Sequence, residues 1–171
     1  MIEINNLTGN KIDEEEVKKI VGAVLSKEGR KGDVSIAFIG PGRMRKLNKK
    51  YRKVNRATDV LSFSEREVEF GAFAIGDIKK SGTLGEIVVC PREILKVSRR
   101  GGAEFQKEIS RVLIHGALHL LGYDHEQSEK ESDIMKKKEE EYLEKSKIKI
   151  TNVKPFGTEA LRAEVSNPKS K

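Results

Sequence analysis

Several residue types are scarce in this 171-residue chain, which has no tryptophan, one cysteine and four prolines. Because Cys90 is the only cysteine, an internal disulfide framework is excluded, and a reducing cytoplasm is the expected compartment. No apolar run approaches the roughly 18 residues of a membrane span, so we expect no membrane partner. The first residues include the acidic Glu3 and lack the apolar core of a secretory signal. These absences favour a cytoplasmic protein.

Charged side chains are abundant, with 34 Lys and Arg against 27 Asp and Glu, for a net charge of +7. Seven of the basic residues and only three of the acidic ones lie in residues 144–171. The remainder of the chain is therefore only mildly basic, and any prediction of nucleic-acid binding has to rest on local clusters of charge.

Hydrophobic periodicity predicts short strands early in the chain and helices later. The predicted strands are 1–7, 33–39, 59–63 and 86–90, and the predicted helices are 14–28, 41–51, 91–100, 103–121 and 128–145. Residues 65–83 are expected to form a loop. This order favours a single mixed α/β domain at residues 1–145. Residues 146–171 have no clear period and are expected to be a flexible basic tail.

The three histidines of the chain all lie in the segment HGALHLLGYDH, residues 115–125. His115 and His119 are four residues apart, so they share one face of a helix. Gly122 can end that helix with a left-handed cap, after which His125 can approach from another direction. Two ligands from a helix and one from the next turn leave the fourth corner of a tetrahedron for water, as in catalytic zinc sites. We therefore predict one Zn²⁺ per chain, although three imidazoles also suit nickel or another divalent transition metal.

The alternative is that these histidines are hydrogen-bonded residues of the core. Two imidazoles buried on one helix face need many polar partners, which a metal satisfies together, so the metal site is favoured. The spacing also matches the zinc motif of metzincin proteases, except that Gly116 replaces the glutamate that acts as general base. Gly116 either makes room for a bulky substrate over the metal or permits close packing of helix and strand.

A basic cluster at residues 43–56, RMRKLNKKYRKVNR, holds eight Lys and Arg and no acid. Solvated helix faces usually mix charges of both signs, so contact with phosphate is the better interpretation. Arg52 has a planar guanidinium that matches phosphate oxygens, and near a metal it would stabilise the charge that builds up in phosphoryl transfer. The other candidate substrate-binding residues are Arg43, Arg45, Lys46, Lys49, Lys50, Lys53 and Arg56.

Three further residues carry weaker signals. Asp59 and Asp124 either orient a histidine or a loop near the site or merely stabilise a turn. Cys90 ends an apolar strand and is expected to be an inert thiol of the core.

The segment HGALHLLGYDH resembles the signature of the YbeY family, bacterial endoribonucleases of ribosomal RNA maturation. LNKKYR followed by TDVLSF, and then GEIVVC, resemble two further blocks of that family, so the likeness spans about residues 47–125. Glu86 stands where the family usually has Asp, and Ser64 where it often has Pro. The tail beyond about residue 145 resembles nothing in the family core.

The resemblance implies a mixed α/β fold, with a small, mostly parallel four-stranded sheet, about five helices and the zinc helix at the centre. It places the zinc ligands at His115, His119 and His125 and the functional arginine at Arg52. It also implies cleavage of single-stranded RNA, maturation of the 3′ end of small-subunit ribosomal RNA, and a role in ribosome quality control.

The leading hypothesis is thus a zinc-dependent endoribonuclease whose partners are ribosomal RNA and the small ribosomal subunit. A metallopeptidase or another small metal-dependent hydrolase is the second hypothesis, against which the missing glutamate argues. The third is a ribosome-binding module with a structural metal and no turnover. Structural zinc usually has four protein ligands, and no fourth Cys or His lies near the three histidines in the sequence.

Overall fold

The computed structural model describes residues 1–65, 82–123 and 128–145. Four strands form one sheet in the order β1 (Ile2–Asn6), β2 (Asp33–Phe38), β4 (Thr83–Val89) and β3 (Val60–Ser64). The first three strands are parallel, and β3 runs antiparallel to β4 at the edge. The expected small, mostly parallel sheet is therefore confirmed.

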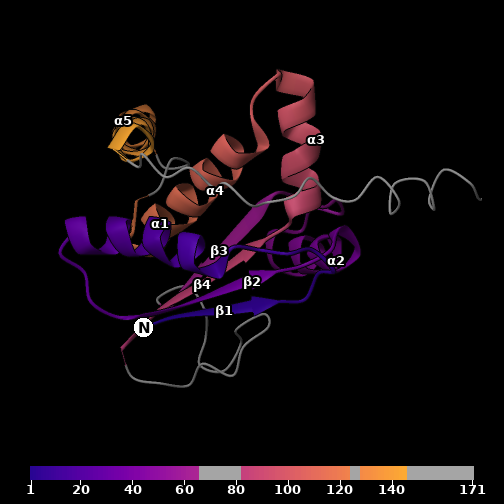
Figure 1. The fold of residues 1–171 in the computed structure, drawn as a ribbon, viewed down its shortest axis with the longest axis horizontal. Helices are drawn as coiled ribbons and strands as arrows, with labels where there is room; N and C mark the ends of the chain where they lie inside the picture. The colour runs from indigo at the N-terminus through magenta and orange to yellow at the C-terminus, as the bar shows by residue number, and fades with distance from the viewer. Residues whose placement is uncertain (66–81, 124–127, 146–171) are drawn as a thin grey trace, which may run out of the picture.

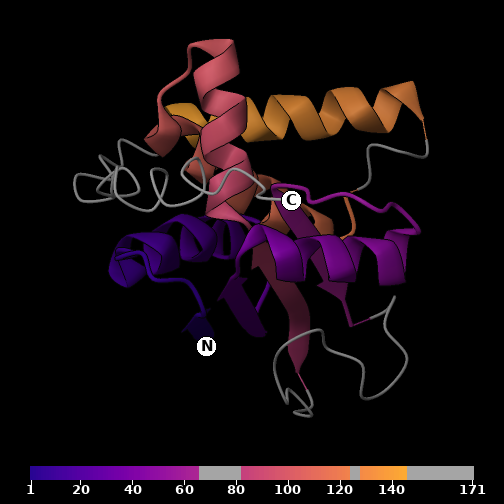
Figure 2. The same cartoon turned by 90° about the vertical axis from the view of Figure 1, so that its right-hand side faces the viewer.

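Five helices accompany the sheet in the described part of the chain, as expected. They are α1 (Glu14–Lys27), α2 (Pro41–Arg52), α3 (Pro91–Gly101), α4 (Phe105–Leu120) and α5 (Glu129–Lys145). Helix α4 is central, because it contacts β3, β4, α1, α3 and α5 (Figure 1). Figure 2 shows α2 in front of the sheet and α5 lying across the upper part of the molecule. None of the described helices has the length and apolar character that a membrane span requires.

The core consists of two clusters on opposite faces of the sheet, and the alternation of side chains along β4 separates them. Ile87 and Val89 belong to the larger cluster, which α1 and α4 cover. Val88 belongs to the smaller one, together with Cys90 and with Met44 of α2. Helices α4 and α2 are thus held on different faces of the sheet by buried apolar contacts.

The ends of two helices follow from the residues found there. At the start of α1, the side chain of Asp13 accepts a hydrogen bond from the backbone N–H of Glu16 at 3.1 Å and caps the helix. At the end of α4, Gly122 has a φ of +93°, which confirms the left-handed turn expected there. The Tyr123 N–H donates to the carbonyl of Leu118 at 3.1 Å, so the helix closes with a Schellman-type motif.

Strand β4 begins at Thr83, three residues before the expected start at residue 86. Gly85 lies within the strand with a φ of +149°. A Cβ at Gly85 would lie 2.2 Å from the carbonyl oxygen of Phe63, so only glycine permits this approach of β3. The rest of the expected loop, residues 66–81, and the expected tail, residues 146–171, lie outside the described residues.

A carboxylate at the end of α1 joins three separate elements. Glu28 accepts hydrogen bonds from Lys138 Nζ at 2.7 Å, from the hydroxyl of Tyr123 at 2.7 Å and from the hydroxyl of Tyr142. Burial raises the pKa of the Glu28 carboxyl, but these hydrogen bonds outweigh burial and leave the pKa below its ordinary value. The cluster fixes α5 and the end of α4 to α1.

Candidate active site

His115 and His119 lie on the same face of α4, as the spacing predicted. Their ring centroids are 4.6 Å apart and the ring planes are inclined by 72°. Two imidazoles bound to one tetrahedral zinc through bonds of about 2.0–2.1 Å would have centroids about 5 Å apart. The observed pair is close to that separation, so the two rings fit a shared metal ion.

Glu139 of α5 contacts the first of these rings. Its Oε1 lies 2.6 Å from Nδ1 of His115, and the side chains are 15% and 28% exposed, respectively. A carboxylate at Nδ1 keeps the proton on that nitrogen and leaves the lone pair on Nε2, the state in which histidine binds metals. Sequence reasoning missed Glu139, because it is one of several acids on a charged helix and is 24 residues from His115.

Both histidines line a cavity of about 620 Å³. The opposite wall comes from the end of α2 and from the segment that leads into β3, with the cationic residues Arg52, Lys53 and Arg56. The family resemblance predicted Arg52 as the functional arginine, and the structure brings its side chain to the same cavity as the two histidines. We name this space the histidine cavity.

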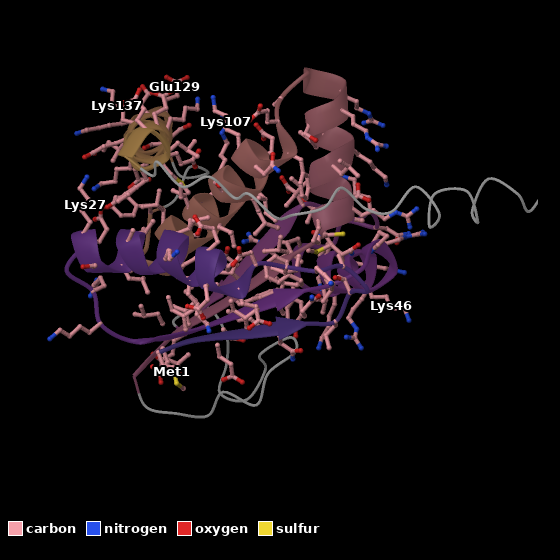
Figure 3. The ribbon with its side chains drawn as sticks, viewed as in Figure 1. Met1, Lys27, Lys46, Lys107, Glu129 and Lys137 are labelled. Atoms are coloured by element: carbon pink, nitrogen blue, oxygen red, sulfur yellow. The ribbon has the colours of Figure 1, made fainter. Side chains whose placement is uncertain are left out.

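The other basic candidates are distributed differently. Arg45 lines a neighbouring cavity, and its Nε donates to Oδ1 of Asn55 at 2.9 Å. Four more candidates are exposed on α2 and are not among the described residues that line either cavity: Arg43, Lys46, Lys49 and Lys50. Lys46 is labelled at the outer edge of α2 in Figure 3.

The segment after α2 has a defined shape. Lys53 adopts a left-handed conformation with a φ of 61° and ends the helix. The side-chain amide of Asn48, which is buried, donates to the backbone carbonyl of Arg56 at 2.8 Å. These contacts hold the cationic wall of the histidine cavity against α2. Asn48 itself lines the cavity, and sequence reasoning missed it, since one asparagine among basic residues gives no signal.

Gly116 permits close packing of α4 on the sheet. A Cβ at this position would lie 2.8 Å from Cγ2 of Ile87 and 3.2 Å from Oγ of Ser62. Of the two interpretations of this glycine, the structure favours helix–strand packing over space for a substrate. It also shows why the glutamate of the protease motif has no room here.

The remaining candidates have different outcomes. Asp59 lines the histidine cavity, and its Oδ1 accepts hydrogen bonds from the Thr58 hydroxyl at 2.9 Å and the Val60 N–H at 3.0 Å, so it stabilises its own turn. Burial raises the pKa of the Cys90 thiol, as expected of an inert core cysteine. Asp124 and His125 lie outside the described residues.

Within the residues that the structure describes, no three His, Cys, Asp or Glu side chains gather as a metal site. The role of His125 as third ligand therefore stays a prediction. Two imidazoles on the central helix suit a metal ion and a cationic wall suits phosphate, so the site fits a hydrolase for a phosphate-containing substrate.

Comparisons with known proteins define the class further. The profile of the family described as Endoribonuclease YbeY matches residues 3–147, and this chain belongs to that family. The family consists of metal-dependent nucleases whose known role is ribosomal RNA processing. The family predicted from the histidine segment is confirmed.

Individual relatives agree with this membership. A protein of Thermoanaerobacter sp. (strain X514) named Endoribonuclease YbeY is 38% identical over 141 residues, which cover 79% of this chain and 88% of the relative. A protein of the same name from Carboxydothermus hydrogenoformans is 36% identical, and the match covers 84% of this chain and 95% of the relative. The solution structure of a Thermotoga maritima protein has a TM-score of 0.58 at 31% identity, covering 84% of this chain and 87% of that one.

Proposed function

We propose that this protein is a zinc-dependent endoribonuclease that cuts single-stranded RNA in the cytoplasm. Its proposed substrate is the precursor 3′ end of small-subunit ribosomal RNA, and the same activity serves ribosome quality control on the small subunit. One observation carries this proposal: Arg52 and the pair His115 and His119 line the same cavity.

The cationic wall binds the RNA backbone. Arg52, Lys53 and Arg56 line the cavity along one short segment, and their positive charge suits successive phosphates of one strand. The guanidinium of Arg52 donates two parallel hydrogen bonds to the oxygens of one phosphate. It also stabilises the negative charge that grows on those oxygens in the transition state.

The histidine wall supplies the metal ligands. His115 and His119 would hold the ion together with His125, and Glu139 keeps the proton of His115 on Nδ1. When bound there, zinc would lower the pKa of its water towards about 7 and would polarise phosphoryl oxygens. The close contact of Gly116 with Ile87 leaves no space for a carboxylate base at position 116, which separates this site from that of the proteases.

Cleavage assays with a matched pair of variants test the proposal. The chain is stripped with a chelator, reloaded with zinc, and given one labelled RNA as a single strand and as a duplex. We expect cleavage of the single strand only, and a loss of about 10²–10³-fold in kcat for Arg52→Ala. Lys46→Ala removes the same charge from the exposed edge of α2 and serves as control (Figure 3). Equal rates for the two variants, or no cleavage by the reloaded wild type, would contradict the proposal.

A further inference from the structure

A second cavity, of about 700 Å³, lies beside the histidine cavity, between the start of α2 and helix α3. Arg56, Thr58 and Asp59 line both cavities, so the two spaces meet at this segment. We name the second space the α3 groove. Its far side is formed by Lys96, Val97 and Arg100 of α3.

The α3 groove has an excess of positive charge. Its cations are Arg45, Arg56, Lys96 and Arg100, and its acids are Glu93 and Asp59. The Glu93 carboxylate contacts Lys96 Nζ at 2.6 Å, and Asp59 accepts hydrogen bonds within its own turn. Four cations against two acids leave the groove a net charge of +2, and Lys96 and Arg100 lie on one face of α3 because they are four residues apart.

The lining also indicates how a ligand would be bound. The described residues that line the groove include no aromatic side chain on which a base could stack, whereas Val97 is 52% exposed and offers a small apolar surface. Binding would therefore rest on phosphates rather than on base edges or stacking. Such contacts are independent of sequence and depend strongly on salt.

We infer that the α3 groove holds the continuation of the RNA strand, so that the strand runs from the histidine cavity across residues 56–59 to Lys96 and Arg100. This inference rests on the proposed function and adds α3 to the substrate-binding surface. Sequence reasoning placed phosphate binding on residues 43–56 alone. The signal from α3 was weak, because its basic residues alternate with apolar ones and with Glu93.

Substrates of two lengths distinguish RNA binding in the α3 groove from RNA binding in the histidine cavity. The substrates are a four-nucleotide and a twelve-nucleotide single-stranded RNA with the same cleavable centre. The test variant is K96Q/R100Q. The control is R99Q/K107Q, which removes the same charge from exposed positions of α3 and α4 that are not among the groove-lining residues.

We expect K96Q/R100Q to lower kcat/KM on the longer RNA at least tenfold, through KM, and to affect the shorter RNA much less. In binding assays on stripped protein, the slope of log Kd against log salt for the longer RNA should fall by about 1.4, since each lost phosphate contact removes about 0.7. The control variant should match wild type in both assays.

Two results would overturn the inference and leave the proposed function standing. One is equal kcat/KM values for K96Q/R100Q and R99Q/K107Q on the longer RNA. The other is an unchanged salt slope, which would point to a different occupant of the groove, such as an acidic protein segment. If the wild type cuts neither RNA, the proposed function fails, and the salt slope still decides whether the groove binds RNA.

Discussion

The two walls of the histidine cavity are built in different ways. The α4 wall lies over the sheet, where Gly116 fits against Ile87 and Ser62, and α5 covers it through Glu139. The α2 wall is a helix end and a loop, held by bonds such as those from Asn48 to the carbonyl of Arg56 and from Arg45 to Asn55. Arg52, Lys53 and Arg56 are exposed on this wall, whereas His115 and His119 are half-buried.

This difference assigns different tasks to the two walls. Metal ligands must be held in a fixed geometry, so they lie on a packed helix with a carboxylate behind one ring. Phosphate-binding residues act mainly through charge and tolerate movement, so an exposed loop suffices. Substitutions on the α4 wall should therefore abolish metal binding or destabilise the protein. Substitutions on the α2 wall should weaken RNA binding.

The largest expected effect is on the α4 wall. His119→Ala should remove metal binding and reduce RNA cleavage below detection, because one of the proposed ligands is lost. Arg43→Ala, an exposed change on α2, should retain both. Metal content and cleavage are measured on the same preparations. If His119→Ala keeps full cleavage with no metal, the division between the walls is wrong.

Glu139→Gln tests the support behind the α4 wall. The amide cannot hold the Nδ1 proton of His115 as the carboxylate does, so we expect zinc affinity to fall by about 10–100-fold. Competition with a coloured chelator gives the affinity. Glu140→Gln, on the same helix, is the control, and equal affinities for the two variants would remove Glu139 from the account.

Glu28→Gln tests how α5 is held beside α4. The folded-state pKa of Glu28 lies below its ordinary value, so its contribution to stability is full above the ordinary pKa and is lost as the pH falls through the folded-state pKa. At pH 7 we expect the variant to be less stable by about 1–2 kcal/mol. Urea unfolding at several pH values should show this difference shrinking in acid. A difference that does not change with pH would contradict the role of the carboxylate.

Two glycine substitutions test the packing of the α4 wall. Gly116→Ala gains about 1 kcal/mol of helix propensity but overpacks against buried Ile87, which costs about 1–3 kcal/mol, so net destabilisation of about 1 kcal/mol is expected. At Gly22 in α1, a Cβ would meet only Ile2 Cδ1, at 3.7 Å. Gly22→Ala should therefore stabilise the protein slightly. Thermal unfolding measures the change in stability of both variants. Stabilisation by both substitutions would show that α4 has room above the sheet.

Much of this architecture could be predicted from the sequence because its signals are local. Asp13 followed by three glutamates predicts the start of α1, and the spacing of His115 and His119 predicts their shared face. The role of Glu139 and the contribution of α3 to the groove could not be predicted, since both depend on how distant helices pack. The start of β4 was missed because several glycines before residue 86 are typical of a loop, whereas close contact with β3 requires a glycine at position 85.

Titration of the stripped protein with zinc tests the central claim most directly. We predict that RNA cleavage rises in proportion to added zinc up to one ion per chain and then stays constant. The variant His115→Ala/His119→Ala should neither retain zinc nor cut RNA. Full cleavage by zinc-free wild type, or one zinc retained by the double variant, would contradict the claim that the α4 histidines hold the ion beside the RNA.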